Sequence, residues 1–198
     1  MKSPIKNLYC LVGILLAGSI CYSANAQTWQ LAPDSAVQVS ITGTSTLTDW
    51  KVVSSGIQGV PGQLTISEEP SQIGAFGFKV PVAGMDGGRG SSMNDKILDA
   101  FKSSENPFVE YTQTQPAKVT KSGDTYTITS TGTLAMAGTT KTVTVESTGV
   151  VKNGMLIISG YKDVKMTDFN MTPPSAMFGQ IKTHDDVVVN YEFRYVKK

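Results

Sequence analysis

The only histidine of the chain, His184, stands directly before two carboxylates, Asp185 and Asp186. An imidazole beside a carboxylate is a common pair for general acid–base catalysis. The three residues precede the last apolar–polar alternation of the chain, and successive residues of a strand point to opposite faces of a sheet. We therefore predict that their side chains do not converge on one point, that they lie in an exposed turn, and that they have no catalytic role.

The first 26 residues are predicted to be a secretory signal peptide. Lys2 and Lys6 precede an apolar run, and "ANA" at 24–26 supplies small residues for cleavage. The run is shorter and more interrupted than a membrane-spanning helix requires. Removal of residues 1–26 would leave a mature chain of residues 27–198 in the periplasm or outside the cell, without a stable membrane span.

Other groups that could do chemistry are sparse in the mature chain. Cys10 and Cys21 are the only cysteines, and both would leave with the signal peptide, so thiol catalysis and cysteine-based metal sites are excluded. The chain has no G-x-S-x-G, H-E-x-x-H or phosphate-binding loop. We predict no catalytic residue, no metal and no cofactor. An enzyme that acts on a lipid would have to use Tyr111, Tyr191 or Asp168 as its acid or base, and this alternative stays open.

The charges of the mature chain are nearly balanced. Of 17 basic residues, two lie in the signal peptide, which leaves 15 basic against 16 acidic residues. A balanced chain gives no electrostatic reason to bind nucleic acid or an anionic membrane surface. The mature length is sufficient for one domain with a substantial core. No repeat, linker or low-complexity segment divides it.

The elements that position the side chains are mostly strands. Apolar residues alternate with polar residues in several short runs, which is the period of a sheet with one buried face. The clearest runs contain Phe76, Phe78, Val80 and Val82, and later Val187, Val189, Tyr191, Phe193 and Tyr195. Turn signals separate the runs, and Asn153-Gly154 is a strong hairpin turn. About eight antiparallel strands are expected, and on this pattern alone they form either a sandwich or a closed barrel.

One segment, residues 91–104, has the period of a helix. Met93, Ile97 and Phe101 are spaced by four residues and form one apolar stripe. Ser91 or Ser92 can cap the start of the helix. We predict a short amphipathic helix whose stripe either covers the core, closing part of a barrel end, or borders a ligand cavity.

Residues 165–186 combine irregular backbone with apolar side chains. Two prolines, Pro173 and Pro174, exclude a regular helix or a central strand. The apolar residues of this segment include Met166, Phe169, Met171, Met177 and Phe178. Methionine side chains are flexible and adapt to irregular shapes. Two interpretations follow: residues 166–178 line or cover the mouth of a cavity, or they complete an ordinary core.

The order of these segments resembles the YceI-like family, which comprises secreted lipid- or polyisoprenoid-binding proteins of bacterial envelopes. The resemblance covers the mature chain and is carried most specifically by "GTLAMAGTTK" at 132–141 and by the "KMTDF…PP…MFG…KT" pattern of residues 165–183. At the helix the chain departs from the family pattern. Many family members carry an Arg-Asp pair followed by His-Leu there, whereas this sequence reads "MNDKIL", with Lys96 and Ile97 instead of that histidine.

The resemblance implies an all-β fold, an eight-stranded antiparallel barrel of lipocalin-like shape, with one short amphipathic helix covering part of the barrel. It also implies a lengthwise apolar lumen that holds a long isoprenoid or fatty chain. Together with the patterns above, it predicts that the side chains that bind the ligand are Phe76, Phe78, Met93, Ile97, Phe101, Met166, Phe169, Met171, Met177, Phe178, Tyr191 and Phe193.

Two functions are therefore weighed. The first is a periplasmic, non-enzymatic binding protein that sequesters or carries a long-chain apolar ligand, such as a polyisoprenoid, an isoprenoid quinone or a fatty-chain lipid. The second is a cell-envelope interaction module that docks a membrane complex through its apolar loop, which an exposed apolar patch would indicate. The expected partner is a lipid or isoprenoid rather than nucleic acid, and a homodimer is a further prediction.

Overall fold

The computed structural model describes residues 26–33, 36–68 and 71–198. The predicted signal peptide lies outside the described residues, apart from Ala26 at the start of the first strand. The strands within these ranges are β1 Ala26–Leu31, β2 Val37–Ser45, β3 Trp50–Ser54, β4 Gln63–Glu68, β5 Ser71–Ile73, β6 Gly77–Pro81, β7 Met85–Asp86, β8 Phe108–Gln113, β9 Ala117–Ser122, β10 Thr125–Met136, β11 Thr139–Lys152, β12 Met155–Lys165, β13 Ser175–Ala176 and β14 Ile181–Lys197.

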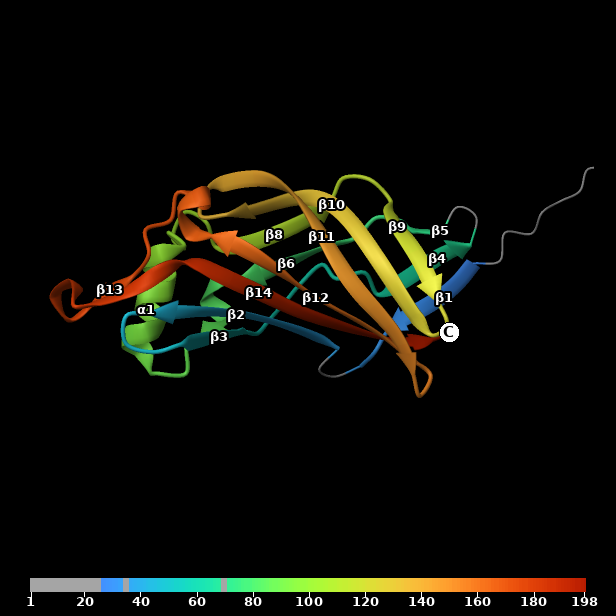
Figure 1. The fold of residues 1–198 in the computed structure, drawn as a ribbon, viewed down its shortest axis with the longest axis horizontal. Helices are drawn as coiled ribbons and strands as arrows, with labels where there is room; N and C mark the ends of the chain where they lie inside the picture. Colours follow the sequence, from blue (N-terminus) through green and yellow to red (C-terminus); the bar gives the residue numbers. More distant parts are fainter. Residues whose placement is uncertain (1–25, 34–35, 69–70) are drawn as a thin grey trace, which may run out of the picture.

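Eight of these strands close into an antiparallel ring. The four long strands β10, β11, β12 and β14 are consecutive neighbours and run along the molecule (Figure 1). Strands β1, β4, β5 and β9 complete the ring, because β14 pairs with β1 and β9 pairs with β10. This closure confirms the predicted all-β fold with an eight-stranded antiparallel barrel, and it leaves these strands without a free edge.

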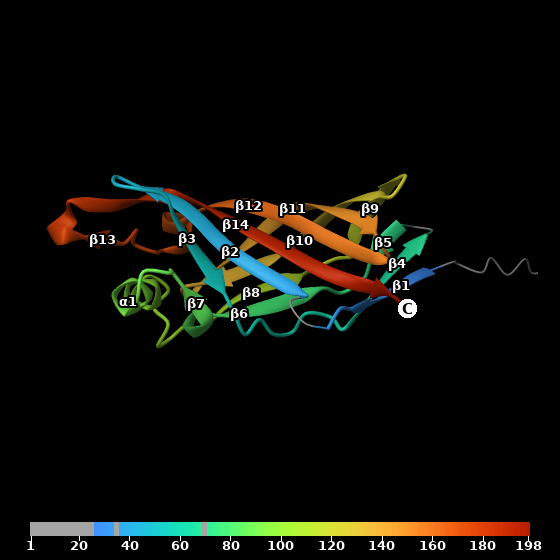
Figure 2. The same cartoon turned by 90° about the horizontal axis from the view of Figure 1, so that it is seen from below.

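A second group of strands extends the barrel toward its other end. Strand β2 pairs with β14 and β3 with β2, while β8 pairs with β10 and β6 with β8. A single bridge, Gln58 to Lys79, connects the segment after β3 to β6. Figure 2 shows these strands on the same elongated body, so the long strands form part of the wall at both ends of the barrel.

The hairpins between the long strands follow from local sequence. Asn153 and Gly154 join β11 to β12 with φ values of 52° and 75°, and Ala137 and Gly138 join β10 to β11 with 49° and 80°. Positive φ at both central residues is the requirement of the two-residue hairpin turn whose twist matches that of the strands. The hairpin predicted at Asn153-Gly154 is therefore confirmed.

The buried residues form two clusters, one at each end of the barrel. The first surrounds Trp29, Leu64, Leu156 and Tyr195, inside the closed ring of eight strands. The second lies under the helix and includes Val82, Ile97 and Phe101 among its members. Partly buried Val37, Phe78 and Tyr191 pack against both clusters and mark the position where they meet.

Helix α1, Ser91–Ala100, covers the end of the barrel that holds the second cluster (Figures 1 and 2). Ile97 and Phe101 are buried and Met93 is half-buried, so the predicted stripe faces inward. The predicted serine cap is wrong: Gly90 is the N-cap and no side chain caps the helix. The Asn94 Oδ1 atom instead accepts a hydrogen bond from the Gly87 backbone N–H at 2.9 Å, which ties the helix to the preceding loop.

Three short 3₁₀ helices, η1 Val82–Gly84, η2 Met166–Phe169 and η3 Met177–Gly179, complete the elements in the described ranges. The helices found between residues 26 and 198, leaving aside the four undescribed positions, are all too short or too polar to cross a bilayer.

Candidate functional site

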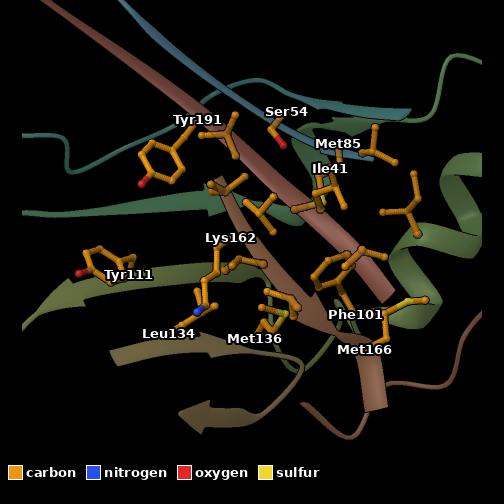
Figure 3. A pocket seen from close by; sticks show the side chains of 18 of the residues that line it. Ile41, Ser54, Met85, Phe101, Tyr111, Leu134, Met136, Lys162, Met166 and Tyr191 are labelled. Carbon is orange, nitrogen blue, oxygen red and sulfur yellow. The ribbon is translucent and has the colours of Figure 1, made fainter. Parts of the chain in front are cut away.

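A cavity of about 400 Å³ lies inside the barrel (Figure 3). The four long strands, β2, β3, β6, β8 and helix α1 all contribute side chains to its wall. Most of these are aliphatic or aromatic, because the inward positions of each strand are the apolar positions of its alternation. A lumen of this kind suits a slim apolar chain and offers it few polar contacts.

The cavity opens at the end that helix α1 covers. Its exposed lining residues are Leu47 and Thr48 in the turn after β2, Arg89 and Ser92 at the start of α1, and Ser175 in β13. The Lys96 Nζ atom donates a hydrogen bond to the Ser175 backbone oxygen at 2.9 Å and joins the helix to β13 across this opening. We call the region around these five exposed residues the mouth.

Three phenylalanines lie together inside the barrel and join its walls. The ring centroids of Phe76 and Phe193 are 5.2 Å apart, those of Phe78 and Phe193 5.4 Å, and those of Phe76 and Phe78 6.3 Å. These separations are within the range of favourable aromatic pairs. The phenylalanine cluster lies where the two buried clusters meet, so it forms the inner part of the cavity, away from the mouth.

Nine of the twelve predicted ligand-binding residues line the cavity. They are Phe76, Phe78, Met93, Ile97, Phe101, Met166, Met171, Tyr191 and Phe193. They come from β6 and the residue before it, α1 and its C-cap residue, η2 and its following loop, and β14, segments that are distant in the sequence. Contact of these side chains with a ligand stays a prediction.

The other three predicted residues lie outside the cavity wall. Phe169 is buried in the core under η2, with Lys141 Nζ 5.7 Å from its ring centroid. Met177 and Phe178 are 65% and 109% exposed at the tip between β13 and β14. Both have φ near 50°, a left-handed conformation that turns the chain sharply, and their side chains extend into solvent. The segment 166–178 is therefore divided between core, mouth and an exposed tip.

Two tyrosines place hydroxyl groups in this mainly apolar lumen. Tyr111 Oη lies 2.6 Å from Ser130 Oγ, and Tyr191 Oη lies 2.8 Å from Ser147 Oγ. Burial raises the pKa of both tyrosines, more than their hydrogen bonds to the two serines lower it. Both hydroxyls are therefore protonated at neutral pH.

Four polar residues that were not among the predicted ligand-binding residues also line the cavity: Ser54, Gln113, Ser130 and Ser147. Each stands at an inward position of a strand whose other inward residues are mostly apolar. That interruption of the alternation is the signal that could have identified them.

The residues first considered for acid–base chemistry are separated in the structure. His184 Nδ1 bonds Thr44 Oγ1, Asp185 accepts hydrogen bonds from the backbone N–H and the hydroxyl of Thr167, and Asp186 pairs with Lys165. The prediction that these side chains do not converge is confirmed, whereas the predicted turn is wrong, because they belong to β14. The two Thr167 hydrogen bonds lower the pKa of Asp185.

The remaining acid–base candidates fall into two groups. Tyr111 and Tyr191 line the cavity, as described above, but Asp168 is exposed and pairs with Lys141 at 3.1 Å, outside the cavity. Among residues 26–33, 36–68 and 71–198, no three His, Cys, Asp or Glu side chains are grouped so that they could hold a metal ion.

The comparisons with known proteins agree with this architecture. Residues 29–195 match the YceI-like domain family. No curated protein matches the chain significantly. Burkholderia cenocepacia BcnA is 18% identical with a TM-score of 0.62, and the match covers 80% of this chain and 95% of BcnA.

Two further solved structures share the fold. A polyisoprenoid-binding domain from Saccharophagus degradans is 12% identical with a TM-score of 0.60, covering 88% of this chain and all of that domain. The Campylobacter jejuni YCEI protein is 16% identical with a TM-score of 0.56, covering 74% of this chain and 84% of that protein.

Proposed function

The chain belongs to the YceI-like family, and from this premise we propose that it binds a long-chain apolar molecule in the lumen of its barrel. The main support for this proposal is the cavity. It is lined mainly by apolar side chains, opens at the mouth and extends to the phenylalanine cluster. The shared fold of the Saccharophagus degradans polyisoprenoid-binding domain supports an isoprenoid, an isoprenoid quinone or a fatty-chain lipid as the ligand.

Burial of the chain would supply the affinity. Each methylene removed from water contributes about 0.8 kcal/mol in gross terms. Ligands of this size realise about 0.3 kcal/mol per heavy atom after the costs of association, so a chain of about 25 carbons would bind with a Kd near micromolar. The protein would act as a carrier or sequestering protein, without a cofactor and without chemical change to its ligand.

The proposed location follows from the amino-terminal segment. Export through the predicted signal peptide would place the mature protein in the periplasm or outside the cell. A hydrophobic ligand that crosses this aqueous space needs a protein to enclose it, which gives the cavity a physiological purpose. A homodimer stays a prediction, because all interactions described above are within one chain.

Binding in the cavity can be tested by a substitution that fills the cavity with a larger side chain. Val145 lines the lumen on β11, whereas Thr142 on the same strand is exposed on the outer face. Val145→Trp should lower the affinity of delipidated protein for the apolar dye N-phenyl-1-naphthylamine by about tenfold or more, because the indole occupies the space of the ligand. Thr142→Trp is the matched control and should bind the dye as the natural chain does.

Equal dye affinity in the two tryptophan variants would contradict binding in the lumen. A mass spectrum of an organic extract of the full chain, purified from its host, identifies the natural ligand. An extract without any long-chain apolar compound would count against the proposal, provided that the same extraction recovers a long-chain lipid added to the purified protein.

The exposed tip favours a second candidate function, the envelope interaction module. Met177 and Phe178 expose large apolar side chains beside the mouth, and such residues are common at protein-binding surfaces. Replacing both with serine should leave the melting temperature and the dye affinity unchanged, because neither side chain packs in the core or lines the cavity.

An interaction module would nevertheless lose its partner in this double variant. Cross-linking in the envelope of the host measures the loss, and Tyr161→Ser, which removes an exposed aromatic ring from the barrel wall, is the control. A cross-linking pattern that is identical in the natural chain and both variants would count against the second function. A drop in dye affinity in the double variant would instead show that the tip contacts the ligand.

A further inference from the structure

A row of polar side chains crosses the apolar wall of the barrel. Ser147 pairs with Gly160, Gly160 with Tyr191, Tyr191 with Val39, and Val39 with Ser54. The five residues therefore form one transverse row over β11, β12, β14, β2 and β3. Three of them, Ser147, Tyr191 and Ser54, carry hydroxyl groups and line the cavity (Figure 3 shows Tyr191 and Ser54). We call these three side chains the hydroxyl row.

Ser54 is the most informative member of the row. Its side chain is 8% exposed, and its Oγ atom has no hydrogen-bond partner among the described residues. Buried hydroxyls in native proteins nearly always have a partner, and one that faces a cavity is placed to bond a molecule inside that cavity. The neighbouring inward residues Val39 and Val52 are apolar and offer no substitute.

Together, Tyr191 and Ser147 can donate one hydrogen bond to a ligand. Their two hydroxyls carry two protons, and the 2.8 Å hydrogen bond between them uses only one. Gly160 lies between them in the row, and a Cβ atom there would come within 2.3 Å of the Tyr191 hydroxyl. The glycine therefore lets this hydroxyl lie close to the barrel wall, where the room beside it stays free for a ligand.

Tyr111 adds an acceptor on the opposite side of the cavity. Ser130 donates its hydroxyl proton to Gln113 Oε1 at 3.1 Å, so Tyr111 is the donor in its 2.6 Å bond to Ser130. The Gln113 amide nitrogen is in turn fixed by the backbone oxygens of Ile73 and Gly74. The Tyr111 oxygen thus keeps its lone pairs available to accept a hydrogen bond from a ligand.

The geometry points to a subsite for a neutral hydroxyl group at the unpartnered Ser54 Oγ atom, inside the lumen rather than at the mouth. The Tyr191–Ser147 pair and Tyr111 are further polar positions of the same lumen. The inference rests on the proposed function and specifies its ligand as a long-chain alcohol, such as a prenol, that enters with its hydroxyl first. An alcohol both donates and accepts a hydrogen bond, which matches the groups that the subsite offers. The apolar chain would extend from the subsite toward the mouth.

A charged head group fits this position less well. The hydroxyl row and Tyr111 contain no cation, and removing a phosphate from water without a paired charge is unfavourable. Lys162 also lines the cavity, two positions along β12 from Gly160, but its Nζ atom donates to the Thr144 backbone oxygen at 3.2 Å. A phosphate would have to draw Lys162 away from this bond.

The test compares three ligands that share one carbon skeleton: geranylgeraniol, its parent hydrocarbon, and geranylgeranyl phosphate. Each displaces N-phenyl-1-naphthylamine from the delipidated full chain. The alcohol should bind about three- to tenfold more tightly than the hydrocarbon, as expected for one or two net hydrogen bonds. Ser54→Ala should remove most of this difference and leave hydrocarbon binding unchanged, and Tyr191→Phe should remove less of it.

Tyr195→Phe is the matched control. Its hydroxyl, on the same strand, bonds the Pro61 backbone oxygen at 3.1 Å and does not line the cavity, so the preference for the alcohol should persist. Equal affinity for alcohol and hydrocarbon in the natural chain would overturn the subsite while leaving apolar binding intact. Tighter binding of the phosphate that depends on Lys162 would also overturn it. If none of the three ligands displaced the dye, both the proposed function and the subsite would be overturned.

Discussion

At the scale of single residues, the buried tyrosines make the free energy of unfolding depend on pH in the alkaline range. Tyr195 is fully buried, and burial raises its pKa above the ordinary value of 10.0. The folded state thus favours the protonated hydroxyl, while the unfolded chain ionises near the ordinary value. The stabilisation is complete below pH 10.0 and is lost as the pH rises through the folded pKa.

We therefore expect the free energy of unfolding to fall above this pH, by up to about 1.4 kcal/mol per pH unit for each such tyrosine. Tyr195→Phe should make the alkaline fall shallower, although it loses the bond to Pro61 at neutral pH. Urea unfolding at a series of pH values measures the slope. Tyr161→Phe, at an exposed position, is the control and should keep the natural slope; an unchanged slope in Tyr195→Phe would contradict the argument.

At the scale of elements, helix α1 is held by its apolar face rather than by a side-chain cap. Ile97 is 7% exposed and lines the cavity, so Ile97→Asp would place a charge on a buried face. The free energy of unfolding should fall by about 3 kcal/mol, measured by denaturant titration.

Ser91→Asp introduces the same residue at the exposed start of the helix, where a negative charge is favourable, and should be neutral or slightly stabilising. Similar losses in the two aspartate variants would mean that the helix does not depend on the burial of its stripe.

At the scale of the whole molecule, the lumen links ligand binding to stability. A ligand that binds only the folded barrel at a hundredfold excess over its Kd adds about 2.7 kcal/mol to the free energy of unfolding. For a chain of this size the melting temperature should rise by roughly 5–10 °C with geranylgeraniol. Thermal unfolding of Val145→Trp should show a much smaller rise, because its lumen is filled. A full rise in this variant would place the ligand outside the lumen.

The same long strands shape both ends of the molecule. Strand β14 pairs with β12 along most of its length, and with β2 and β1 along successive parts of its other edge. One end is filled by the cluster around Trp29 and Tyr195, while the other leaves the cavity under α1. A packed end is therefore joined by continuous strands to an open end, which is a suitable arrangement for a protein that binds a ligand in its lumen.

Local patterns in the sequence were sufficient for the all-β class and for the inward direction of several side chains that line the cavity. Period-two alternation places Tyr191 and Phe193 inward, and the four-residue spacing of Ile97 and Phe101 places them on one helix face, because both periods are fixed by backbone geometry. The hairpin at Asn153-Gly154 is equally local. These features need no knowledge of which strand lies beside which.

Only the tertiary structure decided the rest. The hydroxyl row joins Ser54 to Ser147 across five strands, and its alignment depends on strand register that no local pattern records. Met177 and Phe178 project into solvent because two consecutive left-handed residues turn the chain, and irregular backbone has no period from which a direction could be predicted. Periodicity determined which side chains face inward, and the resemblance to the YceI-like family implied a lumen. The pairing of distant strands determined where that lumen is polar.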